Sequence, residues 1–292
     1  MFDLRYHVAS LAAVFLALII GILVGVGIAS QTSVSESDRQ LLEQRIADLQ
    51  RDLDAARTNA DLFRRQQRAG TSYIEESYPA VMNGRLRTIR VALLFLGAED
   101  SKLRNAVLET LDDASGPPFA RMRALQLPID APRVMSAIPA DSGNPSLEDV
   151  GRRLGREFVG SGETPFWDAL APVIVQDSQG PSQREAQAIV VAQTAALDDG
   201  PTSRFVSGVY AGLAAGSAPV VGVARTDQQP QRIAVYRARG LSSVDAVDTQ
   251  VGRIALAVLL ASGEEGHYGL NADADTVVPP IEPLPLAPPP GG

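Results

Sequence analysis

Side chains with the chemistry to bind a metal or to catalyse a reaction are few in this sequence. Its 292 residues include no cysteine and two histidines, His7 and His267. Without cysteine the chain forms no disulfide, thiolate metal site or cysteine nucleophile. His267 lies in the segment EEGHYG, residues 264–269. There it could be one metal ligand beside a glutamate, a hydrolytic residue or an ordinary surface histidine. Two histidines make a metal site within one chain hard to build, and the residue pattern leaves any metal site undefined.

A second polar group, Asp245, Asp248 and Thr249, precedes a helical pattern. Short polar side chains at such a position accept hydrogen bonds from the unpaired amides of the first helical turn. Alternatively, the two carboxylates could bind a cation or a partner. A cation site would need further oxygen ligands, for example from a loop at residues 271–275. The residue pattern fits both helix capping and the binding of a cation or a partner.

Motifs that hold nucleotides or build hydrolase sites are missing. The apolar run 89–96 is followed by Gly97, Ala98, Glu99 and Asp100, which places two carboxylates where a phosphate would sit. Neither GxxxxGK[ST] nor GxSxG occurs. The net charge of -8 does not supply the basic surface that nucleic acid requires. We therefore predict a protein that is not an enzyme, has no evident cofactor and does not bind nucleic acid.

The element that precedes these residues is a hydrophobic segment at the N-terminus. Residues 8–29 form a run of 22 without a charge, about 33 Å of helix, which is enough to span a bilayer. We expect residues 1–30 to be a membrane anchor, and a cleaved signal peptide is the alternative. The short N-terminal flank favours a cytoplasmic N-terminus and an extracytoplasmic C-terminal part; a cytoplasmic domain is the alternative. Small residues at every fourth position favour close approach of two such helices, and those that we assign to this contact are Ala13, Ala17, Gly21 and Gly25.

Residues 31–79 are expected to form a stalk, which contains a heptad pattern. Apolar residues from 42 to 63 alternate in steps of four and three, and charged residues occupy the other faces. This pattern predicts a coiled-coil stalk and a parallel homodimer, and the alternative is an amphipathic helix packed on its own domain. Tyr78-Pro79 is expected to end or kink the helix. The seam residues assigned to the dimer are Leu42, Ile46, Leu49 and Leu53.

Strand and helix patterns alternate between residues 80 and 270. They predict an α/β domain with an open, mostly parallel, three-layer sheet. Residues 271–292 are expected to be a disordered tail, because seven of the last fourteen residues are proline. The expected strands are 89–96, 120–127, 188–192, 219–223 and 233–236, and the expected helices are 99–113, 147–159, 203–215 and 249–260.

Two segments resemble the MctB family of mycobacterial copper transport proteins. The first is LRYHVASLAAVFLAL, residues 4–18, followed by Gly21 and Gly25. The second is SVDAVDTQVGRIAL, residues 243–256, with Gly266-His267-Tyr268-Gly269 behind it. The resemblance extends over most of the chain. The residues that carry the second motif are Asp245, Asp248, Thr249, Gly252, Arg253 and His267.

The resemblance implies an actinobacterial-type envelope protein of the cell membrane or outer membrane with a role in copper transport or efflux. Copper is implied by this resemblance alone. Copper(I) prefers thiolate and thioether ligands, and the four methionines include no clustered pair. A single apolar helix also has no polar face to line a pore, so that only an oligomer could conduct. Family members are linked to envelope assembly and division as well, so the alternative is a non-catalytic scaffold that presents its α/β domain to a protein partner.

Overall fold

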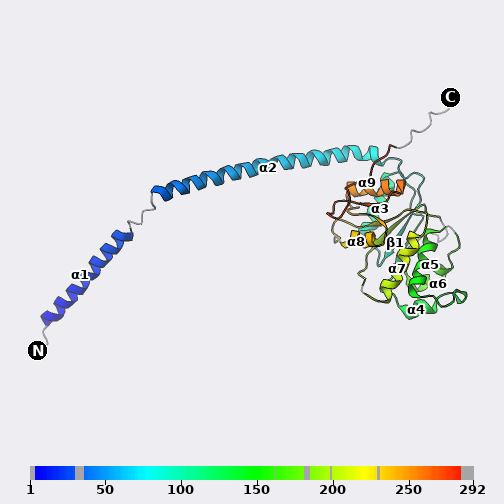
Figure 1. The fold of residues 1–292 in the computed structure, drawn as a ribbon, viewed down its shortest axis with the longest axis horizontal. Helices are drawn as coiled ribbons and strands as arrows, with labels where there is room; N and C mark the ends of the chain where they lie inside the picture. The colour runs from blue at the N-terminus through cyan, green and yellow to red at the C-terminus, as the bar shows by residue number, and fades with distance from the viewer. Residues whose placement is uncertain are drawn as a thin grey trace, which may run out of the picture. The chain divides into compact units, whose positions relative to one another are not determined.

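The computed structural model describes residues 4–29, 36–160, 162–180, 185–197, 199–228 and 231–283 (Figure 1). The chain divides into two compact units, Met1–Gly70 and Thr71–Gly292.

The first unit consists of helix α1, Leu4–Ala29, and most of helix α2, Glu36–Met82. Within α1, residues 10–27 are long and apolar enough to cross a membrane, and their side chains are exposed. The α2 helix continues through Pro79 and ends at Met82. Pro79 lacks the amide that would bond the carbonyl of Glu75, but both residues are exposed, so water can hydrate that carbonyl.

The second unit is built on a seven-stranded sheet with the order β3-β2-β1-β4-β5-β6-β7. All neighbouring pairs are parallel except β2 with β3, which is antiparallel. Strands β1 and β4 are buried along their whole length, as expected for apolar strands that are covered on both faces. The strands are β1 Val91–Leu96, β2 Arg121–Leu125, β3 Val175–Gln179, β4 Ala188–Gln193, β5 Val220–Val223, β6 Ser242–Val244 and β7 His267–Tyr268.

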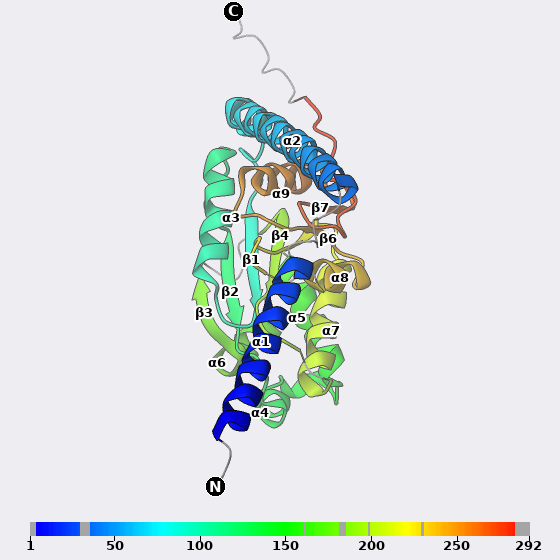
Figure 2. The same ribbon diagram turned by 90° about the vertical axis from the view of Figure 1, so that its left-hand side faces the viewer.

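Helices cover both faces of this sheet, which gives the predicted three-layer α/β fold (Figure 2). Helices α3, Ser101–Asp113, and α9, Gln250–Ser262, pack with the last turns of α2 on one face. Five helices pack on the other face: α4 Ala131–Ser136, α5 Leu147–Val159, α6 Pro165–Ile174, α7 Pro201–Ala214 and α8 Gln231–Ala238. Each layer has its own cluster of buried apolar side chains, so both faces contribute to the core.

Helices α5 and α7 approach so closely that their backbones touch. A methyl group added at Gly208 of α7 would fall 2.0 Å from the carbonyl oxygen of Glu148, and one at Gly155 of α5 would fall 2.3 Å from that of Val209. Only glycine fits at such a contact.

One predicted strand is wrong. Residues 233–236 belong to helix α8 rather than to a strand. Ile233 and Tyr236 are both buried and stand three residues apart, a helical spacing that a run of four residues does not distinguish from a strand. The ring of Tyr236 packs on Gly222 of β5, where a Cβ atom would lie 2.4 Å from the ring. Tertiary packing therefore decides this element.

The α/β domain extends past the predicted boundary at residue 270. The amide of Asp275 donates to the carbonyl of His267 at 2.7 Å, Pro279 is buried, and Arg85 donates to the carbonyl of Glu282 at 3.3 Å. The remainder of the predicted tail, residues 284–292, lies outside the described residues.

Candidate functional site

The strand order reverses between β1 and β4, and in open α/β sheets ligands bind outside the carboxyl ends of the strands at this point. Here the two loops that leave β1 and β4 touch each other. Thr194 donates its hydroxyl to the carbonyl of Ala98 at 2.7 Å, and its amide to the carbonyl of Leu96 at 3.0 Å. Gly97 has a φ of +121°, and a Cβ atom there would lie 2.6 Å from the Thr194 hydroxyl and the Ala195 amide. The backbone itself fills the position at which a ligand would approach.

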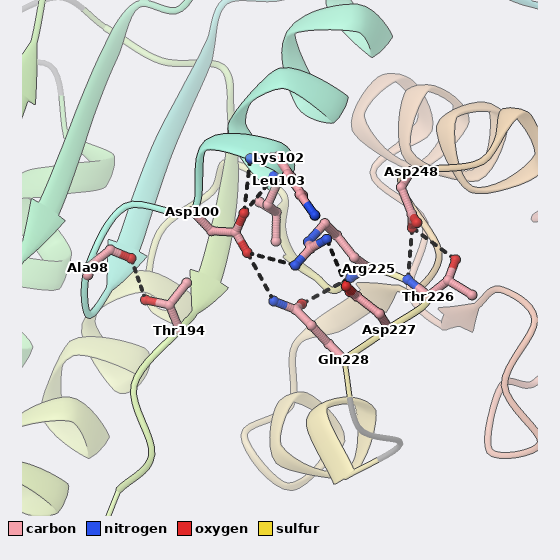
Figure 3. Close-up of polar contacts among 10 residues, drawn as sticks. All are labelled: Ala98, Asp100, Lys102, Leu103, Thr194, Arg225, Thr226, Asp227, Gln228 and Asp248. Atoms are coloured by element: carbon pink, nitrogen blue, oxygen red, sulfur yellow. Dashed lines mark hydrogen bonds and ion pairs between the residues drawn. The ribbon is translucent and has the colours of Figure 1, made fainter.

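Asp100 occupies the N-terminus of α3, the other place where a phosphate would bind. Its carboxylate accepts hydrogen bonds from the amides of Lys102 and Leu103, each at 3.0 Å. Its second oxygen lies 3.3 Å from a terminal nitrogen of Arg225 and 3.4 Å from the side-chain Nε2 of Gln228, which donates to it (Figure 3). The helix dipole is therefore already paired with an internal anion.

The loop after β5 connects this group to the loop after β6. The Arg225 side chain is 14% exposed and also pairs with Asp227 at 3.0 Å. The amide and the hydroxyl of Thr226 donate to one oxygen of Asp248, at 2.8 Å and 3.0 Å (Figure 3). Three groups of hydrogen bonds and ion pairs thus join the loops after β1, β4, β5 and β6, and the backbone links one group to the next. We call the three groups together the carboxyl-edge network. Its members are Ala98, Asp100, Thr194, Arg225, Thr226, Asp227, Gln228 and Asp248.

Glu99 stands beside this network. Burial raises the pKa of its carboxyl group, a hydrogen bond with Asp177 raises it further, and the ion pair with Arg104 opposes both effects. A carboxyl group with a raised pKa can hold a proton, and the partners of Glu99 are Asp177 and Arg104.

The motif residues predicted from the sequence lie at the β6–β7 side of the sheet. Asp245, which is 7% exposed, accepts hydrogen bonds from the amides of Leu270 and Asn271 at 2.6 Å and 2.9 Å. Gly269, with a φ of +142°, makes room for this contact, since a Cβ atom there would lie 1.9 Å from the carboxylate. The loop at residues 271–275 does approach Asp245, and it does so through backbone amides rather than oxygen ligands.

Thr249 caps α9, as the capping interpretation predicts. Its hydroxyl accepts a hydrogen bond from the amide of Gly252 at 3.1 Å. Gly252 packs against the carbonyl of Ala246, from which a Cβ atom would lie only 2.1 Å away. Asp245 and Asp248 do not cap this helix, because their carboxylates bond to the loops after β7 and β5.

Arg253 connects three helices. It projects from α9 to pair with Glu109 and with Asp113, at 3.7 Å, on α3, and its guanidinium lies 5.7 Å from the ring centre of Tyr78 on α2. Burial and the hydrogen bond to Asp113 raise the pKa of the Tyr78 hydroxyl. This cluster fastens the last turns of α2 to the domain.

His267 lies on β7, and its ring nitrogen Nδ1 is 2.9 Å from the hydroxyl of Ser243 on β6. Burial lowers its pKa, Arg237 lowers it further, and Asp275 opposes both. The amide of His267 donates to Asp275 at 2.9 Å. Across the described ranges no group of three or more His, Cys, Asp or Glu residues is placed to hold a metal ion.

The small and heptad residues lie on the first unit. Gly21 and Gly25 have no atom within 4 Å of an added Cβ, and the α1 and α2 positions assigned to self-association are exposed, namely Ala13, Ala17, Gly21, Gly25, Leu42, Ile46, Leu49 and Leu53.

Sequence reasoning missed Thr194, Arg225, Thr226 and Gln228. Thr194 directly follows strand β4, and the other three lie two to five residues after the end of strand β5. Polar residues at strand carboxyl ends are a signal that could have identified them.

Comparison with known proteins relates most of the chain to one family. The profile of the family described as "Copper transport outer membrane protein, MctB" matches residues 1–124 and 152–279. Proteins named Copper transporter MctB from Mycobacterium bovis and from Mycobacterium tuberculosis are each 28% identical to this chain over 319 aligned positions. The alignment covers 95% of this chain and 99% of each relative.

Proposed function

Because this chain belongs to the MctB family of copper transport outer membrane proteins, we propose that it takes part in copper transport across the cell envelope, with α1 as its membrane anchor. The observation that carries this proposal is the extent of the family match. It includes α1, the stalk and most of the α/β domain, so the proposal concerns the whole chain.

Copper in this proposal is cargo. Met82 and Met122 are fully buried in the core, and Met135 is partly buried. Copper(I) prefers sulfur ligands, and these thioethers are packed among apolar side chains rather than grouped at a surface. We therefore propose that copper passes through an assembly that contains several copies or a second protein.

For the orientation we propose a cytoplasmic N-terminus and an extracytoplasmic α/β domain. The native chain has no cysteine, so a single cysteine introduced at the exposed Asp273 can report the side. We expect a membrane-impermeant maleimide to label Asp273→Cys in spheroplasts. Labelling only after lysis would show that the α/β domain lies in the cytoplasm and would refute the proposed orientation.

The direct test compares copper sensitivity in a strain that lacks the gene. We expect hypersensitivity that wild-type protein corrects and that a variant lacking residues 1–30 does not, because the variant has lost its anchor. Purified protein in liposomes shows whether the chain alone conducts copper. Normal copper tolerance of the deletion strain would refute the proposed function.

A second candidate function is a non-catalytic envelope scaffold. The carboxyl-edge network favours it, because the edge at which α/β domains bind small ligands is occupied here by the protein's own side chains. A scaffold predicts envelope or division defects in the deletion strain without a change in copper tolerance. Crosslinking and mass spectrometry of the intact envelope would identify its partner.

A further inference from the structure

We infer that two copies of this chain associate through residues 42–63 of α2 as a parallel, in-register coiled coil, with Asp52 of each copy beside Arg57 of the other. The inference rests on the proposed membrane anchoring by α1 and is independent of copper.

The surface is the apolar stripe of α2. Leu42, Ile46, Leu49 and Leu53 are 52%, 55%, 66% and 50% exposed. They occupy alternating a and d positions of a heptad, and Phe63, at the last d position of the seam, is 73% exposed. Large apolar side chains in such a row are stabilised when they are removed from water. One stripe with charged residues around it requires one partner helix.

The charges that flank the stripe favour a parallel second copy. In this register Asp52 is a g residue and Arg57 is the e residue of the next heptad, and these two positions lie side by side across a parallel pair. Arg57 has an ion pair at 3.6 Å with Asp54 of its own helix, and the side chains of both residues are exposed. Around the start of the seam, Asp38 and Glu43 occupy the corresponding positions with like charge. Within residues 42–63 the g–e pairs are Arg45 with Gln50 and Asp52 with Arg57, and the second pair joins opposite charges.

The membrane anchor determines the register. Helix α1 ends at Ala29 and α2 begins at Glu36, so the same six residues connect them in every copy. Two copies anchored in one membrane therefore present equal positions of α2 at equal height. The anchor also raises the effective concentration of one stripe for the other.

The seam ends where the chain's own domain covers the same stripe. Continued in the same register, the next a positions include Val81, which packs against the core cluster on the α3 and α9 face. Tyr78 and Met82 belong to that cluster. A second copy cannot occupy this part of the stripe, so the dimer contact is confined to the part of α2 before it.

Cysteine crosslinking tests this arrangement because the native chain has no cysteine. Ala55 and Ala56 are adjacent exposed alanines, at c and d of one heptad. In membranes containing the full-length protein, oxidation should convert most of Ala56→Cys into a disulfide dimer and leave Ala55→Cys largely monomeric. Equal crosslinking of the two variants would overturn the seam.

Two further variants test the direction and the end point. Leu42→Cys lies two heptads before Ala56 and should also crosslink, since equal positions meet throughout a parallel pair. Crosslinking at 56 without crosslinking at 42 would refute parallel alignment. Val81→Cys should remain monomeric, and an efficient dimer there would refute the end point. A crosslinked product of unequal mass would identify a different partner and overturn the homodimer.

Charge reversal tests the ion pair. In the Ala56→Cys background, Asp52→Arg should slow dimer formation about tenfold, because it converts two attractive contacts into repulsive ones. The double variant Asp52→Arg with Arg57→Asp should recover the original rate. No recovery would refute the pairing. Copper tolerance is measured separately, so failure of this inference and failure of the proposed function are distinguishable.

Discussion

Replacing Asp245 with asparagine tests whether the carboxylate of this motif residue has a structural role, which is to hold the loop after β7. The buried carboxylate accepts the amides of Leu270 and Asn271 at 2.6 Å and 2.9 Å. Asparagine has the same shape but offers one acceptor oxygen and a donor nitrogen, so one of the two amides faces another donor. A hydrogen bond to a charged group contributes about 1.5–3 kcal/mol, and an unsatisfied amide costs a similar amount. We expect Asp245→Asn to lower the free energy of unfolding by about 2–3 kcal/mol.

The assay is urea unfolding of the full-length protein in a non-ionic detergent, followed by fluorescence of the single tryptophan, Trp167, which is buried in the domain. With a slope of about 3 kcal/mol per molar urea, the midpoint should fall by roughly 1 M. Hydrogen exchange should show loss of protection at Leu270 and Asn271. The matched control is Asp273→Asn, an exposed neighbour, which should change stability by less than about 0.5 kcal/mol. If Asp245→Asn matches the control in both assays, the carboxylate does not hold this loop.

Three other predictions follow from the packing and the pKa shifts. Gly208→Ala should destabilise the domain by about 2 kcal/mol or more in the same assay, because α5 and α7 must separate, whereas Gly70→Ala, with open space around it, should leave tryptophan-detected unfolding unchanged. Burial lowers the pKa of His267, so its neutral form stabilises the fold above about pH 6.5, and this stability is lost as the pH falls through the folded-state pKa; His267→Gln should flatten that pH dependence. Removal of residues 284–292 should not change the melting temperature, but removal of 279–292 should lower it by about 2–4 °C, because it takes away a buried proline; equal melting of the two truncations would contradict the packing of that segment.

Most of the sheet could be predicted from the sequence because its central strands are continuous apolar runs. Val91–Leu96 and Ala188–Gln193 are buried on both faces, and burial of that kind leaves a signal in composition alone. The edge strand Val175–Gln179 has four exposed residues and no apolar pattern, so nothing in its composition distinguished it from a loop. Strand β6 is three residues long, too short for a period to be recognised.

The contacts of the candidate site were less predictable than the elements. Capping by Thr249 follows from local sequence, since the donor and acceptor are three residues apart. The bond between Asp245 and the amides after β7 joins residues 25 and 26 positions apart. Such a pairing depends on the strand order, which places β6 beside β7, and one sequence does not specify that order.

The carboxyl-edge network affects which surfaces of this domain can bind another molecule. A ligand at the α3 N-terminus would have to displace Asp100 from two amides and from Arg225. Charge-assisted bonds of this kind contribute about 1.5–3 kcal/mol each, so their loss would offset much of the affinity of a small ligand. A partner that docks on the outside of the network has no such cost, because the network stays intact beneath it. We therefore expect partners of this domain to bind its outer surfaces rather than a position within the carboxyl edge of its sheet.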